Sequence, residues 1–335
     1  MTTLIEMSDL SNPQYLIGLD VGGTKIEAIA VGEDQNILSH LTLPTDASSQ
    51  SGAANSIREA IDAILATLED GAEYVGAIGL GVPGQIRNGV VELAVNLNMK
   101  SFPLGEVLFS EFSIPVVLEN DVRAAALGAY QYFAHREPIK NLAYLSIGTG
   151  IAAGVIIEGK LYKGSNGMAG EIGHLMIEPD GPRCNCGSYG CLEAMAAGPA
   201  YVAQAERLLQ SGQPSLLRDF DLLTAQVIYQ AAQKNDPLAL QIVQKNSGYL
   251  SRAIQLLIMA YDVEKVVLGG GVSHDGDSFL MPILAELAGL RAHSELANIM
   301  LAESKITLMP NTYNAGLWGA INLARQMVQS PILEK

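Results

Sequence analysis

Positive charge is scarce in this sequence of 335 residues. Lysine and arginine together number 20 against 35 aspartates and glutamates, which gives a net charge of −15. A protein of this charge repels the phosphates of nucleic acids and the head groups of anionic lipids, so neither is expected as a partner. A nucleotide is not excluded, because a few backbone N–H groups can bind a phosphate group locally.

Cysteine is also scarce, and long apolar runs are missing. The 3 cysteines lie close together, and an odd number cannot pair completely, so their spacing indicates a metal site in a reducing compartment, the cytoplasm. The uncharged stretch 141–157 is short for a membrane span and is interrupted by Ser146, Thr149 and three glycines. Residues 1–14 lack the basic-then-apolar pattern of a signal peptide and are expected to form a polar tail.

The cysteines and one histidine provide a complete set of tetrahedral zinc ligands. The set is His174, Cys184, Cys186 and Cys191. The C-x-C spacing places two thiolates on one tight turn, and the neighbouring glycines allow that turn to bend. The alternative is that the cysteines are buried as small apolar side chains, which is their usual state. Glu171 and Glu193 flank the ligands, so a zinc ion here would also hold a site that carries two carboxylates.

Two strand–glycine–strand segments suggest a duplicated domain. In the first, apolar runs over residues 15–20 and 26–31 enclose Val21-Gly22-Gly23-Thr24-Lys25; in the second, 142–147 and 151–157 enclose Gly148-Thr149-Gly150. Bare backbone in such a turn can wrap a phosphate group, although an ordinary tight hairpin is the alternative for each turn alone. The two segments match in length and lie about 130 residues apart. We therefore expect each half to offer one turn to a nucleoside triphosphate bound between two lobes.

Polar or glycine-rich segments follow several other predicted strands. Gly81-Val82-Pro83-Gly84 follows the strand 75–80, and the amides of Asn96 and Asn98 in the next loop could bind sugar hydroxyls or support turns. Glu119-Asn120-Asp121 stands between the strand 114–118 and the helix 122–133, where Asp121 could cap the helix or act as a general base. Gly269-Gly270-Gly271 follows the strand 265–268 and would let the backbone approach a base or ribose.

Length and the remaining patterns predict an α/β protein of two domains. Apolar residues at helical spacing predict a helix that includes residues 57–68. Asp236-Pro237 predicts the start of a long helix that reaches about residue 261. A last strand over 306–309 leads to a final helix that holds Trp318, the single tryptophan.

Together, these motifs resemble those of the ROK family (repressors, open reading frames and sugar kinases), and they occur in the same order along residues 15–323. The shared motifs are Asp20-x-Gly22-Gly23-Thr24-Lys25, Gly81-x-Pro83-Gly84, Glu119-Asn120-Asp121, Gly148-Thr149-Gly150, Glu171-x-Gly173-His174, Cys184-x-Cys186-Gly187-x-x-Gly190-Cys191-x-Glu193 and Gly269-Gly270-Gly271-Val272. The cysteine–histidine segment is the most specific of them. The bacterial glucokinases of the family resemble the chain most, because the interval between His174 and Cys184 is short.

The resemblance implies a duplicated actin/hexokinase-like (ribonuclease H-like) α/β fold, with ATP and a sugar bound in a cleft between two lobes. Residues 15–121 with 312–330 would form a small lobe, and residues 122–311 a large lobe with the zinc motif. The implied activity is ATP-dependent phosphorylation of a hexose at its 6-hydroxyl, with glucose as the first candidate. ATP, Mg²⁺ and a structural Zn²⁺ are the implied cofactors, and a homodimer or homotetramer is the implied assembly.

The resemblance also assigns roles to individual residues. Asp121 would be the general base that takes the proton from the sugar hydroxyl. Other sugar contacts would come from Gly84, Asn96, Asn120, Glu171, His174 and Glu193. The nucleotide and its Mg²⁺ would be bound by Asp20, Gly22, Gly23, Thr24, Lys25, Gly148, Thr149, Gly150, Gly269, Gly270, Gly271 and Val272. The chain departs from the family at Arg123, where asparagine is usual, and at Met99, where a tryptophan often follows the sugar-binding asparagine.

Three other functions stand as alternatives. A kinase of the same family could act on another hexose or an N-acetylated amino sugar, such as fructose, N-acetylmannosamine or N-acetylglucosamine. A sugar-sensing repressor would carry a helix-turn-helix domain ahead of the first glycine turn, where only 14 residues precede Tyr15. A non-catalytic sugar-binding protein would be expected to lack Asp121 or the phosphate-binding turns, and both are present.

Overall fold

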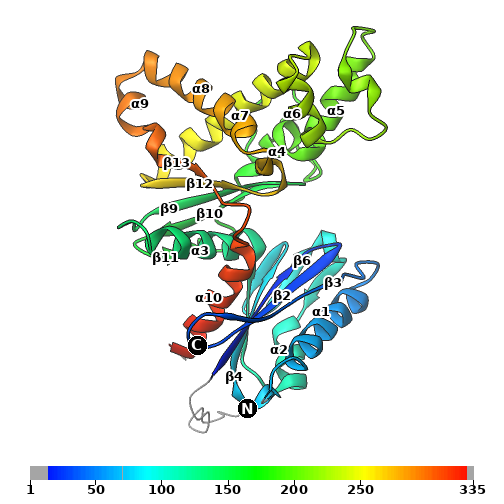
Figure 1. Ribbon diagram of the computed structural model, residues 1–335, viewed down its shortest axis with the longest axis vertical. Coiled ribbons are helices and arrows are strands. Elements are labelled where there is room, and N and C mark those ends of the chain that lie inside the picture. Colours follow the sequence, from blue (N-terminus) through cyan, green and yellow to red (C-terminus); the bar gives the residue numbers. More distant parts are fainter. Residues whose placement is uncertain (1–13, 70, 330–335) are drawn as a thin grey trace. The chain divides into compact units, whose positions relative to one another are not determined.

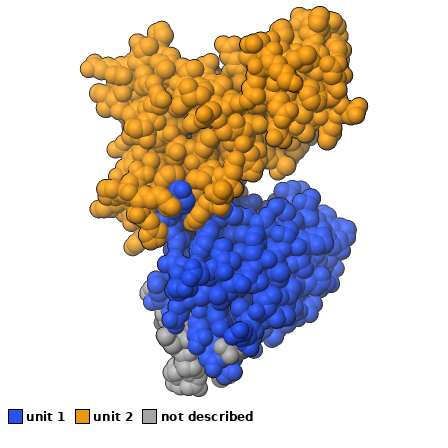
Figure 2. All heavy atoms as spheres, viewed as in Figure 1, with its two compact units in different colours: residues 1–132, 164–167, 314–335 blue, residues 133–163, 168–313 orange. Residues whose placement is uncertain are grey.

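The computed structural model describes residues 14–69 and 71–329, which divide into two compact units. The first unit contains the residues up to 132, residues 164–167 and those from 314 onward, and the second contains residues 133–163 and 168–313 (Figure 2). The expected polar tail over residues 1–14 lies outside the described residues except for Gln14, whose N–H donates to the carbonyl of Tyr74.

A five-stranded mixed sheet forms the centre of the first unit, in the order β3-β2-β1-β4-β8 (Figure 1). Its strands are β1 (Tyr15–Val21), β2 (Lys25–Val31), β3 (Ile37–Pro44), β4 (Val75–Val82) and β8 (Val116–Asn120). β2 runs antiparallel to both β1 and β3, and β4 and β8 run parallel to β1. The β1–β2 hairpin contains the first predicted glycine turn, and its register places Asp20 opposite Glu27.

Helices cover both faces of this sheet. They are α1 (Gln50–Leu65), α2 (Leu104–Phe112) and α10 (Ala315–Gln329). Helix α3 (Asp121–Ala134) follows β8 and packs closely against α10, where a Cβ atom on Gly128 would lie 2.0 Å from the carbonyl oxygen of Ala315. Successive side chains of a strand point to opposite faces. Ile17 and Leu19 therefore belong to the core that contains the buried residues of α1, whereas Ile29 and Val31 pack against α10. The predicted helix over 57–68 ends earlier than expected, at Leu65, but Leu68 is still buried in the same core.

A small antiparallel sheet, in the order β5-β6-β7, lies between β4 and α2 along the chain. Its strands are β5 (Gln85–Arg87), β6 (Val90–Ala94) and β7 (Met99–Phe102). Asn96 is exposed on a one-turn 3-10 helix between β6 and β7. Met99, where the family often has tryptophan, is 1% exposed and belongs to the hydrophobic core of this unit.

The second unit contains a five-stranded sheet in the order β11-β10-β9-β12-β13. Its strands are β9 (Leu142–Ile147), β10 (Ile151–Ile157), β11 (Lys160–Leu161), β12 (Lys265–Gly269) and β13 (Ile306–Leu308). β10 is antiparallel to β9 and β11, and β12 is parallel to β9 and β13. Strand order and strand directions thus repeat those of the first sheet, which confirms the duplication predicted from the two glycine turns.

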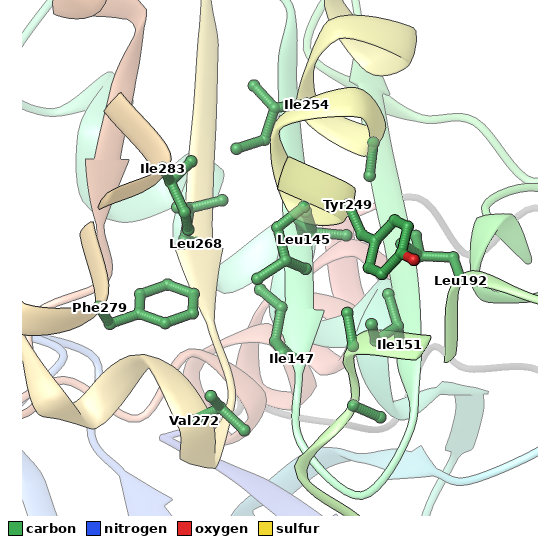
Figure 3. Packing of buried hydrophobic residues seen from close by; sticks show 14 of the residues in the cluster. Leu145, Ile147, Ile151, Leu192, Tyr249, Ile254, Leu268, Val272, Phe279 and Ile283 are labelled. Carbon is green, nitrogen blue, oxygen red and sulfur yellow. The ribbon is translucent and has the colours of Figure 1, made fainter. Parts of the chain in front are cut away.

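Helices of the second unit pack on its sheet around one large apolar core. They are α4 (Leu192–Ala196), α5 (Gly198–Leu209), α6 (Ala225–Gln233), α7 (Pro237–Tyr261), α8 (Asp277–His293) and α9 (Glu295–Met300). Leu145 of β9 and Leu268 of β12 lie in this core with Ile254 of α7 and Ile283 of α8 (Figure 3). The long predicted helix is confirmed as α7, and the carboxylate of Asp236 accepts the N–H of Ala239 at its start, as the sequence predicts.

The second glycine turn is anchored in this core. Ile147 and Ile151, on either side of the turn, belong to the same buried cluster as Leu192, the first residue of α4 (Figure 3). Within residues 14–69 and 71–329, every helix is too short or too polar to cross a membrane.

Candidate functional site

The first glycine turn packs against the loop that carries Asn96. The N–H of Gly22 donates to the carbonyl of Lys25 at 2.9 Å, which closes the turn, and Thr24 and Lys25 are exposed. A Cβ atom on Gly23 would lie 2.9 Å from the carbonyl oxygen of Asn96. The structure therefore brings the predicted phosphate turn and one predicted sugar ligand together within the first unit.

A group of carboxylates lies at the end of β1. Burial raises the pKa of Asp20 to about 7, and repulsion by Asp121 and Glu27 adds to the rise, while Lys25 and Asn314 act in the opposite direction. Glu27 lies directly opposite Asp20 across the hairpin, bonds Lys25 and accepts from the side chain of Asn314 at 3.0 Å. Concentrated negative charge of this kind provides oxygen ligands for a divalent cation.

The junction between β8 and α3 holds Asp121 through its neighbours. Oδ1 of Asp121 accepts the N–H of Val122 and the side-chain amide of Asn120, both at 2.9 Å. The same Asn120 amide donates to the carbonyl of Gly84 at 3.0 Å. Three predicted residues, Gly84, Asn120 and Asp121, are thus joined in one hydrogen-bonded chain.

The helix cap at this junction is mainly Asn120. Its Oδ1 accepts the backbone N–H of Arg123 at 3.1 Å, the contact expected of an N-cap residue, whereas Asp121 is the first residue of the helix. Asp121 is not the N-cap residue, but its carboxylate also stabilises the start of the helix by accepting the N–H of Val122. The two roles weighed for this carboxylate from the sequence are compatible.

An ion pair that sequence reasoning did not single out lies beneath this junction. Nε of Arg123 donates to Oε1 of Glu119 at 2.8 Å, and the two side chains are only 2% and 3% exposed. Oε1 of Glu119 also accepts the backbone N–H of Asn120 at 2.8 Å. In the sequence, the spacing of four residues between opposite charges could have indicated this ion pair. That spacing usually marks a pair on one helix, whereas here Glu119 lies on a strand and Arg123 on a helix.

The second glycine turn is held by α4 and α5. The N–H of Gly198, the first residue of α5, donates to the carbonyl of Gly148 at 2.8 Å. The N–H of Ile151 donates to Oε2 of Glu193 at 3.0 Å. A Cβ atom on Gly150 would lie 2.5 Å from that same oxygen. Glu193, predicted as a sugar ligand, therefore also supports the backbone of the turn.

The triple-glycine segment lies beside this turn. Gly269 ends β12, Gly270 has φ 86°, and Gly271 and Val272 begin a short 3-10 helix. A Cβ atom on Gly148 would be 3.9 Å from the backbone nitrogen of Gly271. The predicted phosphate turn and the predicted adenosine segment are thus neighbours in the second unit.

The predicted metal ligands converge. Ligand atoms of His174, Cys184, Cys186 and Cys191 all lie within 4.8 Å of one another. Nδ1 of His174 is 3.7 Å from the sulfur of Cys184, and the sulfurs of Cys186 and Cys191 are also 3.7 Å apart. With Zn–S bonds of about 2.3 Å, a tetrahedron has edges of about 3.8 Å. The four side chains therefore fit a tetrahedral zinc ion.

Glu171 and His174 lie on one short turn of chain next to this cluster. The backbone N–H of His174 donates to the carbonyl of Glu171 at 3.1 Å, with Glu171 half-buried and His174 exposed. The sulfur of Cys184 lies 3.9 Å from Oε1 of Glu193. The cysteine cluster thus connects three of the predicted sugar ligands of the second unit.

A pocket of about 740 Å³ opens between the cysteine segment and helices α5 and α7. Among its lining residues are three predicted site residues, Thr149, Cys184 and Glu193. Arg207 of α5 and Lys245 of α7 also line it, two cations that sequence reasoning did not single out. No spacing or motif near these two cations distinguishes them from ordinary surface residues of amphipathic helices.

Comparison with known proteins gives a consistent result. The ROK family matches residues 16–327. A glucokinase of Halalkalibacterium halodurans is 37% identical over 281 residues, which cover 81% of this chain and 84% of that protein. An N-acetylmannosamine kinase of Shigella boydii is 34% identical over 260 residues, which cover 76% of this chain and 82% of that protein.

Solved structures agree with the fold class expected from the sequence. The crystal structure of a ROK family glucokinase from Streptomyces griseus in complex with glucose and AMPPNP has a TM-score of 0.74 and 30% identity. The likeness covers 93% of this chain and 99% of that one. The predicted actin/hexokinase-like α/β fold is thereby confirmed.

Proposed function

Because the chain belongs to the ROK family, we propose that it is an ATP-dependent sugar kinase that phosphorylates glucose at its 6-hydroxyl. The observation that carries the proposal is the Gly84–Asn120–Asp121 chain of hydrogen bonds, which fixes a carboxylate directly after β8, an edge strand of the first sheet. Ligands of α/β sheets bind outside the carboxyl ends of the strands. Asp121 is therefore well placed to be the general base.

In this reaction Asp121 would accept the proton of the 6-hydroxyl as the sugar oxygen bonds to the γ-phosphorus of ATP. The bond between that phosphorus and the oxygen of ADP breaks, and the products are glucose 6-phosphate, ADP and the proton held at Asp121. Phosphoryl transfer depends mainly on positioning and on neutralising charge. A carboxylate that accepts the hydroxyl proton contributes about 10²–10⁴-fold to the rate.

The nucleotide would be held by backbone more than by side chains. Residues 22–25 and 148–150 would surround the phosphates, and residues 269–272 would line the adenosine. Asp20 would bind Mg²⁺, which neutralises charge on the phosphates. The cluster of Asp20, Glu27 and Asp121 fits such a cation because Lys25 and Asn314 offset only part of the rise that burial and mutual repulsion cause in the pKa of Asp20. Family membership supports these roles.

Sugar hydroxyls would be bound by Asn96, Asn120, Glu171, His174 and Glu193, with the backbone of Gly84. Both side-chain N–H groups of Asn120 donate within the protein, so this residue would act mainly by holding Asp121 and through its Oδ1. We propose that Nδ1 of His174 binds a structural zinc ion together with the three cysteines. The Nε2 atom of His174 would then face the sugar.

We propose a cytoplasmic homodimer or homotetramer. A reducing compartment would keep the three cysteines as metal-binding thiolates. Light scattering during size-exclusion chromatography measures the assembly directly.

A coupled ADP-release assay over a panel of hexoses tests the activity, with Asp121→Asn as the control variant. We expect glucose to give the highest kcat/KM and the variant to be slower by about 10²–10⁴-fold. Asparagine keeps an oxygen that can accept the N–H of Val122, so the junction should remain folded. A higher kcat/KM with N-acetylmannosamine than with glucose would favour the amino-sugar alternative, which the Shigella boydii relative supports.

A further inference from the structure

We propose that Arg123 is a positioning residue, whose buried guanidinium neutralises Glu119 and thereby fixes the Asn120–Asp121 pair. The inference rests on the proposed kinase activity and adds a residue that takes no direct part in it.

The contacts form a continuous path from the guanidinium to the base. Nε of Arg123 and the backbone N–H of Asn120 share Oε1 of Glu119, each at 2.8 Å. The backbone N–H of Arg123 fixes Oδ1 of Asn120, and the Asn120 amide donates to Oδ1 of Asp121. Glu119 and Asn120 are held at the end of β8, and Arg123 is held on the first turn of α3.

Because the Arg123–Glu119 pair is buried, the negative charge of Glu119 depends on the guanidinium of Arg123 for neutralisation. Both side chains of the pair are nearly inaccessible, so an uncompensated Glu119 carboxylate would be strongly unfavourable. Glu119 would then take up a proton or move toward solvent, and the backbone N–H of Asn120 would lose its acceptor. Either change displaces the amide that holds Asp121.

Stability alone accounts poorly for this ion pair. Nη2 of Arg123 is buried and has no hydrogen-bond partner among the described residues, which is an unfavourable state for a charged donor. Buried ion pairs can often be replaced by apolar side chains without loss of stability. A role in holding the neighbouring Asn120–Asp121 pair explains why a partly unsatisfied cation occupies this position.

Four variants of the full-length protein test the role. Arg123→Met removes the charge, Arg123→Lys keeps it, and the double variant Glu119→Gln/Arg123→Met removes both charges, so that no buried charge is left unpaired. Arg58→Met is the matched control, because Arg58 forms a half-exposed ion pair with Glu111 in the same unit. Thermal denaturation reports folding, and steady-state kinetics are measured with whichever hexose the wild type phosphorylates best.

We expect Arg123→Met to lower kcat by about 10- to 100-fold, as a misplaced catalytic group does. The double variant should recover most of kcat, because a neutral amide at position 119 needs no counter-charge and its oxygen can still accept the N–H of Asn120. The KM for ATP should stay within about threefold, because no residue in this path is proposed to bind the nucleotide. Arg123→Lys should recover most of kcat, and Arg58→Met should match the wild type. If Arg123→Met does not fold, Arg123→Gln, which is also uncharged but polar, takes its place.

The proposal is overturned if a folded Arg123→Met retains the wild-type kcat, since the pair is then only structural, or if the double variant loses as much kcat as Arg123→Met, since charge balance is then not what positions Asp121. It is also overturned if Arg123→Lys loses as much as Arg123→Met, because charge would then not be what positions Glu119. Failure of the proposed function is a separate result: the wild type would phosphorylate no sugar, or prefer one other than glucose.

Discussion

The two glycine turns occupy the same place in two equivalent sheets, yet they are held by different chemistry. The first turn joins β1 and β2, carries Asp20, Lys25 and Glu27 on its own strands, and packs against the carbonyl of Asn96. The second turn joins β9 and β10, which bring no charged side chain to it. It is held instead by hydrogen bonds to the carboxylate of Glu193 on α4 and from the N–H of Gly198 on α5.

This difference shows what duplication provides and what later segments of the chain add. The strand order repeats, so each unit presents a turn at an equivalent position. The charge at the first turn comes from the hairpin itself, whereas support for the second depends on α4, whose N-cap residue is Cys191, one of the metal ligands. Metal binding should therefore affect the second turn and leave the first unchanged.

Removal of the metal is expected to produce the largest difference between the two turns in local stability. We expect about one zinc ion per chain, and we expect Cys191→Ser or a chelator to lower the midpoint of thermal unfolding by about 10 °C or more. Hydrogen exchange should rise in residues 148–151 and 172–198 and remain unchanged in residues 15–31. Elemental analysis supplies the metal content. Full activity and unchanged exchange in protein without metal would refute the structural role of the cysteines.

A methyl group on Gly150 should weaken the second turn through Glu193. The added Cβ would lie 2.5 Å from Oε2 of Glu193, so this carboxylate or the turn must move. We expect Gly150→Ala to raise the KM for ATP about tenfold, which corresponds to about 1.4 kcal/mol. Gly148→Ala is the matched control, because its nearest neighbouring atom would be 3.9 Å away. Equal effects of the two substitutions would show that Glu193 is not what holds the turn.

The raised pKa of Asp20 at the first turn should make the free energy of unfolding depend on pH. The pKa of Asp20 is about 7 in the folded protein against 3.8 for an ordinary aspartate. The folded state therefore binds more protons between these values, and its stability falls as the pH rises from about 4 to 7.

Over this pH range we expect the free energy of unfolding of the wild type without Mg²⁺ to fall by on the order of 1 kcal/mol or more, because one pKa unit corresponds to about 1.4 kcal/mol. Urea unfolding at several pH values measures it, with Asp20→Asn as the comparison. The variant should show a flatter dependence, and added Mg²⁺ should flatten that of the wild type. A dependence that is the same in both proteins would contradict the assignment to Asp20.

Much of the fold and the metal set could be predicted from the sequence because the signals are local. Glycines between two apolar runs indicate a hairpin wherever they occur, and the cysteine spacing defines its own turn. Glu27 could have been found as well, since counting outward from the first turn pairs it with Asp20. Family resemblance supplied the roles that local patterns leave open.

Other features depend on contacts between distant segments and could not be read from spacing. The bond from Ile151 to Glu193 joins residues 42 apart in the chain, so no pattern near Glu193 indicated that it supports a turn. The Arg123–Glu119 pair spans a strand and a helix, and burial, which the sequence does not give, is what makes it important. Met99 is 1% exposed and lies in the core of the first unit, and burial of this kind is likewise not visible in the sequence.

Single-turnover phosphoryl transfer from labelled ATP to glucose, compared between the wild type and Asp121→Asn, is the most direct test of Asp121 as the general base. The product is identified by NMR, and glucose binding to both proteins is measured by calorimetry. We expect glucose 6-phosphate from the wild type and transfer slower by about 10²–10⁴-fold in the variant, with glucose affinity nearly unchanged. Transfer at the wild-type rate by Asp121→Asn would contradict the role of Asp121.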